Sequence, residues 1–479
     1  MQSTPSFIYQ GQTRFQTLIL PILKPRKVDS TWTAQSYSYQ QLPTQTSIRV
    51  LSLLPSEVAA TSIAQDGEDP IRCSIKTVDL ESHPVYEALS YAWGDPLVFY
   101  RDKDDIVPAE DWYKPTYEII CDGQAVSITA NLFAALLARR RMVNRLSGPD
   151  GKTLARQMEQ MGYVPQEHVW IDAVCINQSD LDEREAQVAI MARIYSQAAV
   201  VNAWLGGEDE ASLDIHPVMR HLSSADAVQA HILQAEQLRG MSLADTRLYQ
   251  ILNIPYIQRD EWVSLWAFFN RSWFRRAWVV QEMGLAKKAV MSVGLKTFLF
   301  DLPYGVHMML RDTRLVHEVR NLGEKIADEI EKWGSAPLIP LKPLYRSQPA
   351  MRWDHNHFLT IGEVRSGFGI EGKDYRRDPT AEPYPLRFLL TSFRSTEAKD
   401  PRDKIYAFLG ISKELSLLSP TARHDRATAL AAPSYQKPVF QVFLDTMRFD
   451  VENTQTLDML SLVQSSRFRK ITSLPSWLP

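Results

Sequence analysis

Cysteine is scarce in this sequence, with Cys73, Cys121 and Cys175 the only three among 479 residues. They form no CxxC pair, and their odd number does not suit a disulfide scaffold, so we expect a reducing compartment. No apolar run approaches the roughly 18 residues that a membrane helix needs. The apolar stretch 18–23 is broken by Pro21 and is too short for a signal peptide. The sequence therefore predicts an intracellular protein without a membrane span, in the cytoplasm by default and in the nucleus as the alternative.

An excess of either charge is also missing, because 53 basic residues stand against 56 acidic ones and the net charge is −3. A nucleic-acid-binding protein normally carries a basic face, so we expect no nucleic-acid partner. The patterns GxxxxGK[ST], GxGxxG, GxSxG and HExxH do not occur, which excludes the common nucleotide, esterase and zinc-protease motifs. The ten histidines are scattered, and His355 and His357 lack a third ligand nearby, so we expect no metal site.

The apolar share of 45% is sufficient for a hydrophobic core, and the length suggests one large α/β domain with accessory regions. Residues 1–45, rich in Gln, Ser, Thr and Tyr, predict a flexible arm. Asp122-Gly123 predicts the turn of a β-hairpin over 118–128, and Thr129 suits the N-cap of a helix over 131–145. Other β-rich runs predict strands at 48–54, 71–75, 86–93, 200–205 and 289–294, and the chain beyond 300 has mostly helical patterns.

The block from Val169 to Gly206 is the most informative part of the sequence. Residues 169–176 are almost wholly apolar, which predicts a strand buried on both faces of a parallel sheet. A helix follows, and two pairs suit its capped start: Ser179 with Asp182, or Asp180 with Glu183. Together with the strand at 200–205 this makes a βαβ unit, which implies a right-handed crossover and a parallel pair of strands.

Three features favour a structural role over a chemical one. Arg139, Arg140 and Arg141 could bind a phosphate, but cations in the last turns of a helix also complement its macrodipole, and we prefer that interpretation. Aromatic residues fall on one helix face, which is typical of a core stripe; they are Trp262, Trp266, Phe269 and Trp273. Cys175 has no histidine at a useful spacing and is interpreted as a small buried thiol.

Asp172 is the polar residue that most needs an explanation. A carboxylate within an apolar strand requires a cation, backbone donors or a ligand, because burying it alone costs several kcal/mol. A structural pair with Arg184 or Arg276 is the preferred interpretation. Ligands of open parallel sheets bind at the carboxyl ends of strands. Polar residues follow two predicted strands, Gly94-Asp95 after one and Asn177-Gln178 after the other, so they could converge there, although Asn177 could equally cap a helix.

The segment 275–282 offers a third polar group. On a helix, Trp278 and Glu282 are four residues apart and share a face, with Arg275 close by. Glu282 could act as a general base or hold ribose hydroxyls. It could also be only the salt-bridge partner of Arg275 or Arg271, and chemistry alone favours this second interpretation.

Five separated blocks together resemble the heterokaryon incompatibility (HET) domain of filamentous fungi: YEALSYAWGD (86–95), NLFAALLARRR (131–141), residues 169–206, RSWFRRAWVVQEMGLA (271–286) and DPRDKIYAFLGI (400–411). Of their residues we single out Trp93, Gly94, Asp95, Asp172, Asn177, Gln178, Arg184, Arg276, Trp278 and Gln281 as motif positions. The resemblance implies a division into an arm (1–45), a HET domain (46–299) and a mostly helical C-terminal region (300–479). The end, LPSWLP, resembles a point where such proteins continue, so we expect the natural chain to continue past Pro479.

The resemblance implies a role in fungal non-self recognition, in which the domain triggers cell death after incompatible hyphae fuse. It also implies a fold distantly similar to the Toll/interleukin-1 receptor (TIR) domain, a flavodoxin-like, mostly parallel sheet flanked by helices. One hypothesis is an effector that works by assembly with itself or with other proteins of the response. The other is a glycohydrolase of NAD, the only cofactor considered, with Glu282 or Glu183 on the ribose and Asp172, Asn177 and Trp278 shaping the pocket. An acidic insertion at 96–117 would lie beside that crevice.

Overall fold

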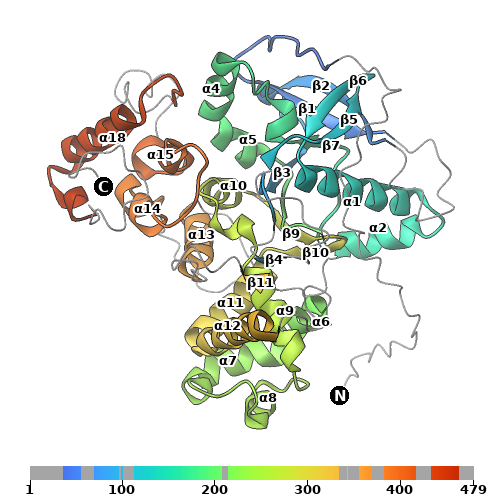
Figure 1. Cartoon of the computed structure of the whole chain (residues 1–479), viewed down its shortest axis with the longest axis vertical. Helices are drawn as coiled ribbons and strands as arrows, with labels where there is room; N and C mark the ends of the chain where they lie inside the picture. Colours follow the sequence, from blue (N-terminus) through green and yellow to red (C-terminus); the bar gives the residue numbers. More distant parts are fainter. Residues whose placement is uncertain are drawn as a thin grey trace, which may run out of the picture.

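The computed structural model describes residues 36–54, 70–96, 99–100, 113–160, 162–207, 214–333, 342–343, 355–368, 382–416 and 433–462. Figure 1 shows three groups of elements: a β-sheet with its covering helices, a helical lobe below it, and a set of C-terminal helices beside it. Helix α10 (Val279–Gly284) lies where the three groups meet. Among the described residues, no helix is both long and apolar enough to cross a membrane.

The described part of the chain forms a nine-stranded sheet with the order β10-β9-β8-β3-β7-β1-β2-β5-β6. The strands β7, β3, β8 and β9 are parallel to one another, and β2 is parallel to β5. The pairs β9–β10, β7–β1, β1–β2 and β5–β6 are antiparallel, so the sheet as a whole is mixed. The strands are β1 (Ser47–Leu53), β2 (Arg72–Asp79), β3 (Glu87–Tyr91), β5 (Tyr117–Cys121), β6 (Gln124–Ile128), β7 (His168–Trp170), β8 (Val200–Trp204), β9 (Ala289–Val293) and β10 (Lys296–Leu299). A separate antiparallel pair joins β4 (Phe99–Tyr100) to β11 (Lys342–Pro343).

The parallel strands have the order of a flavodoxin-type sheet. Numbered along the chain as β3, β7, β8 and β9, they lie side by side in the order 2-1-3-4. In such sheets the strand order reverses between the first and third strands, and the crevice at their carboxyl ends is the usual ligand position. Here that position lies beyond Tyr91 of β3 and Trp204 of β8. The expected α/β class, with hairpin additions to a helix-flanked sheet, is confirmed.

Helices cover both faces of this sheet. Because successive side chains of a strand point to opposite faces, β3 presents Glu87 and Leu89 to one layer and Ser90 to the other. Helices α1 (Ala130–Ser147) and α2 (Gly151–Gln160) form the first layer. The second layer contains α5 (Met191–Gln197) and α10, which packs against α5. Short elements join them: η1 (Leu80–Ser82), α3 (Asp172–Cys175), α4 (Leu181–Ala189) and η4 (Ser272–Arg275).

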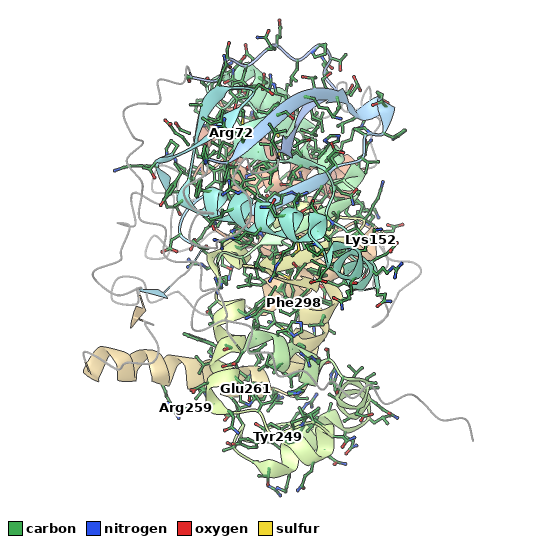
Figure 2. All side chains as sticks on the ribbon, turned by 90° about the vertical axis from the view of Figure 1, so that its right-hand side faces the viewer. Arg72, Lys152, Tyr249, Arg259, Glu261 and Phe298 are labelled. Atoms are coloured by element: carbon green, nitrogen blue, oxygen red, sulfur yellow. The ribbon has the colours of Figure 1, made fainter. Side chains whose placement is uncertain are left out.

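The helical lobe comes mainly from the connection between β8 and β9. It contains α6 (Ile215–Leu222), α7 (Ala225–Leu238), α8 (Thr246–Leu252) and α9 (Arg259–Phe269), joined by α11 (Asp301–Asp312) and α12 (Leu315–Trp333). Figure 2 places Tyr249, Arg259 and Glu261 in this lobe, on the side away from Arg72 of the sheet. The predicted aromatic stripe is buried: Trp262, Trp266 and Phe269 lie on α9, and Trp273 follows in η4.

The C-terminal helices are α13 (His355–Gly367), α14 (Leu386–Ser392), α15 (Asp403–Leu409), α16 (Lys413–Ser416) and α18 (Val439–Thr454), followed by η5 (Asp458–Leu462). Two of them, α13 and α15, contact α10 directly. Arg365 of α13 is buried, and its Nη1 donates to the carbonyls of Met283 (2.6 Å) and Ala286 (2.8 Å) at the end of α10. Burial lowers the pKa of Arg365 to about 10.

The prediction for residues 169–176 is wrong in part. The strand ends at Trp170, and the next residues turn into the short helix α3, so Asp172 begins a helix instead of lying within a strand. A short apolar run suits a buried strand and a buried helical turn equally well, and periodicity does not separate them. Strands β7 and β8 are parallel, as expected, but β3 lies between them and pairs with both. The hairpin is confirmed, with positive φ at Asp122 (50°) and Gly123 (79°).

Several predictions fall partly outside the described residues. Residues 1–35, most of 96–117 and the LPSWLP end are not covered, so the arm, the insertion and the continuation past Pro479 stay predictions. Residues 36–40, at the end of the predicted arm, do lie against the sheet domain. The Tyr37 amide donates to the Ala125 carbonyl (2.9 Å), and the Tyr39 hydroxyl donates to the Val174 carbonyl (2.9 Å).

Candidate functional site

A chain of polar groups is buried where β3 meets α10. The Trp273 indole Nε1–H donates to Ser90 Oγ (2.8 Å), and the Ser90 hydroxyl donates to Glu282 Oε2. Because the indole is only a donor, it occupies an acceptor position of Ser90 and directs the serine proton towards Glu282. Glu282 is 1% exposed, so this carboxyl group sits in the protein interior. The sequence placed Glu282 on a helix face, and the structure turns that face towards β3.

Arg276 is the cation of this cluster. Its Nη1 lies 3.5 Å from Glu282 Oε2, and its charge also acts on Asp172, which lowers the pKa of both carboxyl groups against the effect of burial. Asp172 Oδ2 accepts from Trp93 Nε1 (2.9 Å), and Oδ1 accepts from the Ala173 amide (2.7 Å). Of the two proposed partners for Asp172, Arg276 is the one whose charge acts on its pKa. We call Ser90, Asp172, Arg276 and Glu282 the polar centre.

The electrostatics of the polar centre favour protonation of its acids. Burial is the main cause and raises the pKa of both Asp172 and Glu282. The charge of Asp172 raises the pKa of Glu282 further, and both carboxylates raise the pKa of Tyr91. Burial likewise holds the pKa of Tyr91 and Tyr195 well above the usual value, so both hydroxyls stay neutral. Two carboxyl groups thus share one guanidinium in an interior of low polarity. Such perturbed groups are typical of functional sites, although structural networks produce them too.

The raised pKa of Glu282 predicts a pH-dependent stability. The folded chain binds this proton more tightly than the unfolded chain, so the contribution is present at acidic pH and is lost as the pH rises through the raised pKa. We expect the urea midpoint of the native chain to fall between pH 5 and pH 8 by more than that of Glu282→Gln. Glu236→Gln, at a glutamate whose side chain is 78% exposed, is the control and should keep the native response. Parallel responses of the native chain and Glu282→Gln would contradict the prediction.

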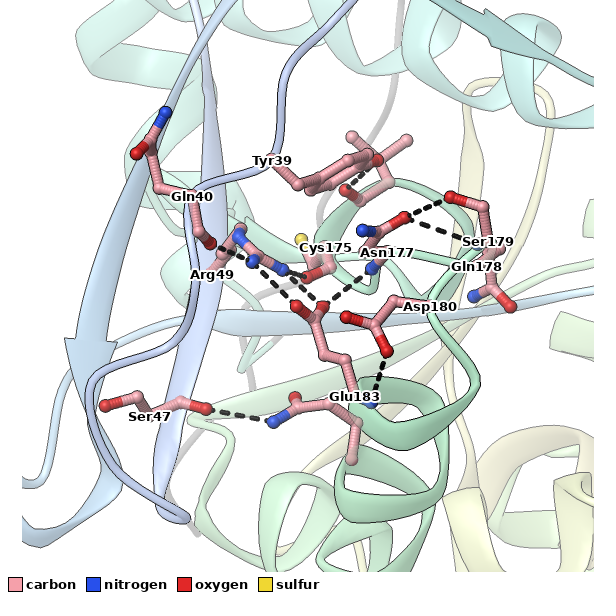
Figure 3. Close-up of polar contacts among 12 residues, drawn as sticks. Tyr39, Gln40, Ser47, Arg49, Cys175, Asn177, Gln178, Ser179, Asp180 and Glu183 are labelled. Atoms are coloured by element: carbon pink, nitrogen blue, oxygen red, sulfur yellow. Dashed lines mark hydrogen bonds and ion pairs between the residues drawn. The ribbon is translucent and has the colours of Figure 1, made fainter. Parts of the chain in front are cut away.

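Glu183, the other candidate glutamate, belongs to a different hydrogen-bond network (Figure 3). Arg49 binds it with two nearly parallel hydrogen bonds, Nη1 to Oε1 (2.6 Å) and Nη2 to Oε2 (2.9 Å). The Asn177 amide also donates to Oε1 (2.7 Å), and Arg49 reaches the carbonyls of Cys175 (3.0 Å) and Gln40 (2.5 Å). Arg49 is 2% exposed and lies over the Tyr39 ring (4.9 Å). These bonds tie β1, α3 and α4 together, which is a structural role.

The turn before α4 explains the polar residues that follow α3. Asn177 Oδ1 accepts from the Ser179 amide (3.3 Å) and hydroxyl (2.7 Å), and Gln178 Nε2 donates to the Asp172 carbonyl (2.8 Å). Asp180 caps α4 by accepting from the amides of residues 182 and 183, so the second of the two predicted capping positions is used. Asn177 and Gln178 therefore shape a turn, and the convergence of Asn177 with Asp95 on one crevice stays a prediction.

Residues Gly94 and Asp95 directly precede the insertion at 96–117, and Tyr113 of that insertion contacts Gly94. A Cβ on Gly94 would stand 2.4 Å from the Tyr113 ring, so this position accepts only glycine while Tyr113 covers it. The Asp95 carbonyl accepts from Ser272 Oγ (2.6 Å), and the Pro96 carbonyl accepts from the Ser272 amide (3.0 Å). The ends of the insertion thus cover the carboxyl edge of β3, beside the position where a ligand would be expected.

The remaining motif residues point towards the C-terminal helices. The Arg184 guanidinium lies over the Tyr435 ring, 3.8 Å from its centre. Gln281, with its amide oriented to satisfy both neighbours, donates to the Ala407 carbonyl (3.2 Å) and accepts from the Ala192 amide (3.1 Å). Trp278 is the N-cap of α10. Arg184 and Gln281 therefore join the sheet domain to segments more than a hundred residues away.

A second buried polar cluster, which sequence reasoning missed, lies on the α1 face. Glu87 is 0% exposed, and its Oε1 lies 2.8 Å from Arg139 Nη1. Tyr163 and Asn202 also donate to Glu87, at 3.4 and 3.2 Å. Beside it is a cavity of about 40 Å³, room for one or a few waters, which includes Ser292 and Thr297 in its lining. The signal was present, because a glutamate in the apolar run of β3 needs a cation as much as Asp172 does. Ser90 carried no such signal.

Comparison with known proteins shows a family similarity in the part of the chain that holds these clusters. The model of the family described as "Heterokaryon incompatibility protein (HET)" matches residues 86–282, from the residue before β3 to the glutamate of the polar centre. Residues 86–282 are therefore similar to a HET domain. The expectation drawn from the five sequence blocks is confirmed for the first four of them, in whole or in part. The matched segment contains every member of the polar centre and both members of the Glu87–Arg139 pair.

The chain is also similar to heterokaryon incompatibility protein 6, OR allele, of Neurospora crassa, with 24% identity over 459 residues. This similarity covers 91% of the chain and therefore extends well beyond residues 86–282 into the C-terminal helices. The aligned region is 57% of the length of that relative. No solved structure matches the chain significantly.

Proposed function

We propose that this chain is a fungal heterokaryon incompatibility protein that acts in the cytoplasm as a signalling and cell-death effector through its HET domain. The observation that carries the proposal is the extent of the family match, which begins beside β3 and ends on Glu282. The named relative supports the same role, because the similarity to it includes the C-terminal helices. Its partners would be other proteins of the incompatibility response or further copies of the chain.

The proposal assigns the polar centre to the effector function. A buried acid cluster costs stability compared with well-packed apolar residues, so a sequence that keeps one has another use for it. Glu282 is bound by Ser90 and Arg276 on its inner side and is carried by α10, which the C-terminal helices contact. A change in the position of α10 would therefore alter the polar centre, and the C-terminal helices are placed to control it.

Controlled expression in a fungal host tests this role. We expect the full chain to reduce the number of viable colonies at least tenfold, and Glu282→Gln to restore viability at an equal protein level. Glu236→Gln, on the surface of α7, should kill as the native chain does. Survival of cells that contain the soluble native chain, or killing by a folded Glu282→Gln protein, would refute the proposal.

One observation favours a second candidate, cleavage of NAD in the manner of some TIR relatives. Glu282 and Arg276 lie near the carboxyl end of β3, the strand beside which the strand order of the sheet reverses. Asp172 lies nearby and accepts a hydrogen bond from the Trp93 indole. Glu183 fits this role poorly, because Arg49 holds both of its oxygens. At 1% exposure, Glu282 would meet a substrate only after its cover moves. The same purified proteins decide the matter: nicotinamide release by the native chain but not by Glu282→Gln supports the enzyme, and killing without release rejects it.

A further inference from the structure

Residues 433–437, which we call the latch segment, are bound as a peptide would be. Glu185 of α4 binds the backbone of this segment, because its Oε1 accepts hydrogen bonds from the amides of Tyr435 (2.5 Å) and Gln436 (3.2 Å). The Ser434 hydroxyl donates to the same oxygen (3.2 Å). One carboxylate of the HET domain thus fixes three consecutive residues that lie about 250 positions further along the chain.

The side chain of Tyr435 fills a pocket between α4 and the segment that leads into α15. Its ring lies under Arg184 (3.8 Å) and near Arg402 (5.3 Å), with Tyr406 at its edge (5.6 Å). Its hydroxyl donates to Asp403 Oδ1 (2.6 Å), and the residue is 9% exposed. An aromatic ring held by cations on its face and by an acceptor at its tip is a specific anchor.

The opposite side of the latch segment is held by Arg402. Its Nη1 donates to the carbonyls of Tyr435 and Lys437 (2.8 Å for the latter), and Asp400 orients the guanidinium through Nε (2.9 Å) and Nη2 (2.7 Å). Glu185 therefore binds amides of the segment, Arg402 binds its carbonyls, and the Tyr435 side chain lies in a pocket. Extended peptides are commonly recognised in this way, by backbone hydrogen bonds for affinity and a pocket for specificity.

This pocket is connected to the polar centre. Asp403, which accepts from Tyr435, also interacts with the Trp278 side chain, which lowers the Asp403 pKa against the effect of burial. Trp278 caps α10, and Gln281 of α10 bonds to Ala407 of α15. The latch segment, α15 and α10 thus form a continuous set of contacts that ends on the helix of Glu282.

We propose that the surface formed by Arg184, Glu185, Arg402 and Asp403 is a docking site from which the latch segment can be displaced. When the latch segment is bound there, it holds α10 in the position that buries the polar centre. This regulation rests on the proposed function for its biological meaning, but the docking itself does not. We expect the segment to be exchangeable because it is held by hydrogen bonds to charged side chains and by one aromatic anchor, contacts that a peptide of the same sequence can also make. Gln436, the residue after the anchor Tyr435, is exposed.

A labelled peptide of residues 431–440 tests the docking site on the full chain. We expect it to bind Tyr435→Ala, whose site lacks its own anchor, at least tenfold more tightly than the native chain, whose site is filled. Adding Arg184→Ala to Tyr435→Ala should remove binding, and a peptide with alanine in place of the tyrosine should not bind. Equal binding to the native chain and a natively melting Tyr435→Ala protein, or no binding to the latter, would overturn the proposal.

Amide hydrogen exchange covers the case in which Tyr435→Ala does not fold. Excess peptide should speed exchange in α10 of the native chain at least threefold and leave β3 unchanged. Unchanged exchange in α10 at a peptide concentration that occupies the site would refute the closing role. Neither measurement depends on cell death or on NAD, so failure of the docking site and failure of the effector function can be told apart.

Discussion

Replacing Arg49 with leucine is expected to lower the free energy of unfolding by about 3–5 kcal/mol, a large share of the stability of a typical domain. The substitution leaves Glu183, whose side chain is 10% exposed, with its charge buried and its bidentate partner gone. It also removes the donor to the Cys175 and Gln40 carbonyls, so β1, α3 and the end of the arm lose a shared contact. Urea denaturation of the purified variant measures the loss.

A double-mutant cycle separates the ion pair from simple packing. Arg49→Leu combined with Glu183→Leu should be less destabilised than the sum of the single changes, since no charge is then left unpaired. Arg247→Leu is the matched control: its guanidinium pairs with Asp245, but its side chain is 73% exposed, and we expect no change in the urea midpoint. A small loss for Arg49→Leu, or strictly additive changes, would show that the network contributes little.

The Glu87–Arg139 pair predicts an effect of similar size on the other face of the sheet. Arg139→Met keeps much of the side-chain volume but leaves the fully buried Glu87 without its cation, and we expect a loss of about 3–5 kcal/mol. Arg145→Met, at an exposed position of the same helix, should change the urea midpoint little. If both variants melt alike, Tyr163 and Asn202 are sufficient to hold Glu87, and the arginine is dispensable.

Local patterns were sufficient to predict much of the fold. Asp122-Gly123 predicted a hairpin turn and has positive φ at both residues. The β-rich runs at 48–54, 200–205 and 289–294 correspond to the strands β1, β8 and β9. Strand order was harder to predict, because nothing near β7 or β8 indicates that β3 inserts between them. The run after Val169 was misread because four apolar residues fit a helical turn and a strand equally.

The candidate site shows the same limit at the level of single residues. Glu183 and Glu282 are chemically identical, and only partners far along the chain distinguish them: Arg49, 134 residues before the first, and Ser90, 192 residues before the second. Asp172 was recognised as needing a cation, but the choice between Arg184 and Arg276 depended on where α10 packs. Pairing requirements can be inferred from sequence, whereas the identity of the partner requires the tertiary structure.

The contacts of Arg365 join α13 to the end of α10, outside the residues that the family match covers. The carbonyls of Met283 and Ala286 lie just after the end of the family-defined segment, and the group that satisfies them comes from α13, about 80 residues later. A fragment that ends at Glu282 would lack both carbonyls and their donor, and it would expose the side of α10 that α13 covers. The end of the family match is therefore not a boundary in the packing, which continues from α10 into α13.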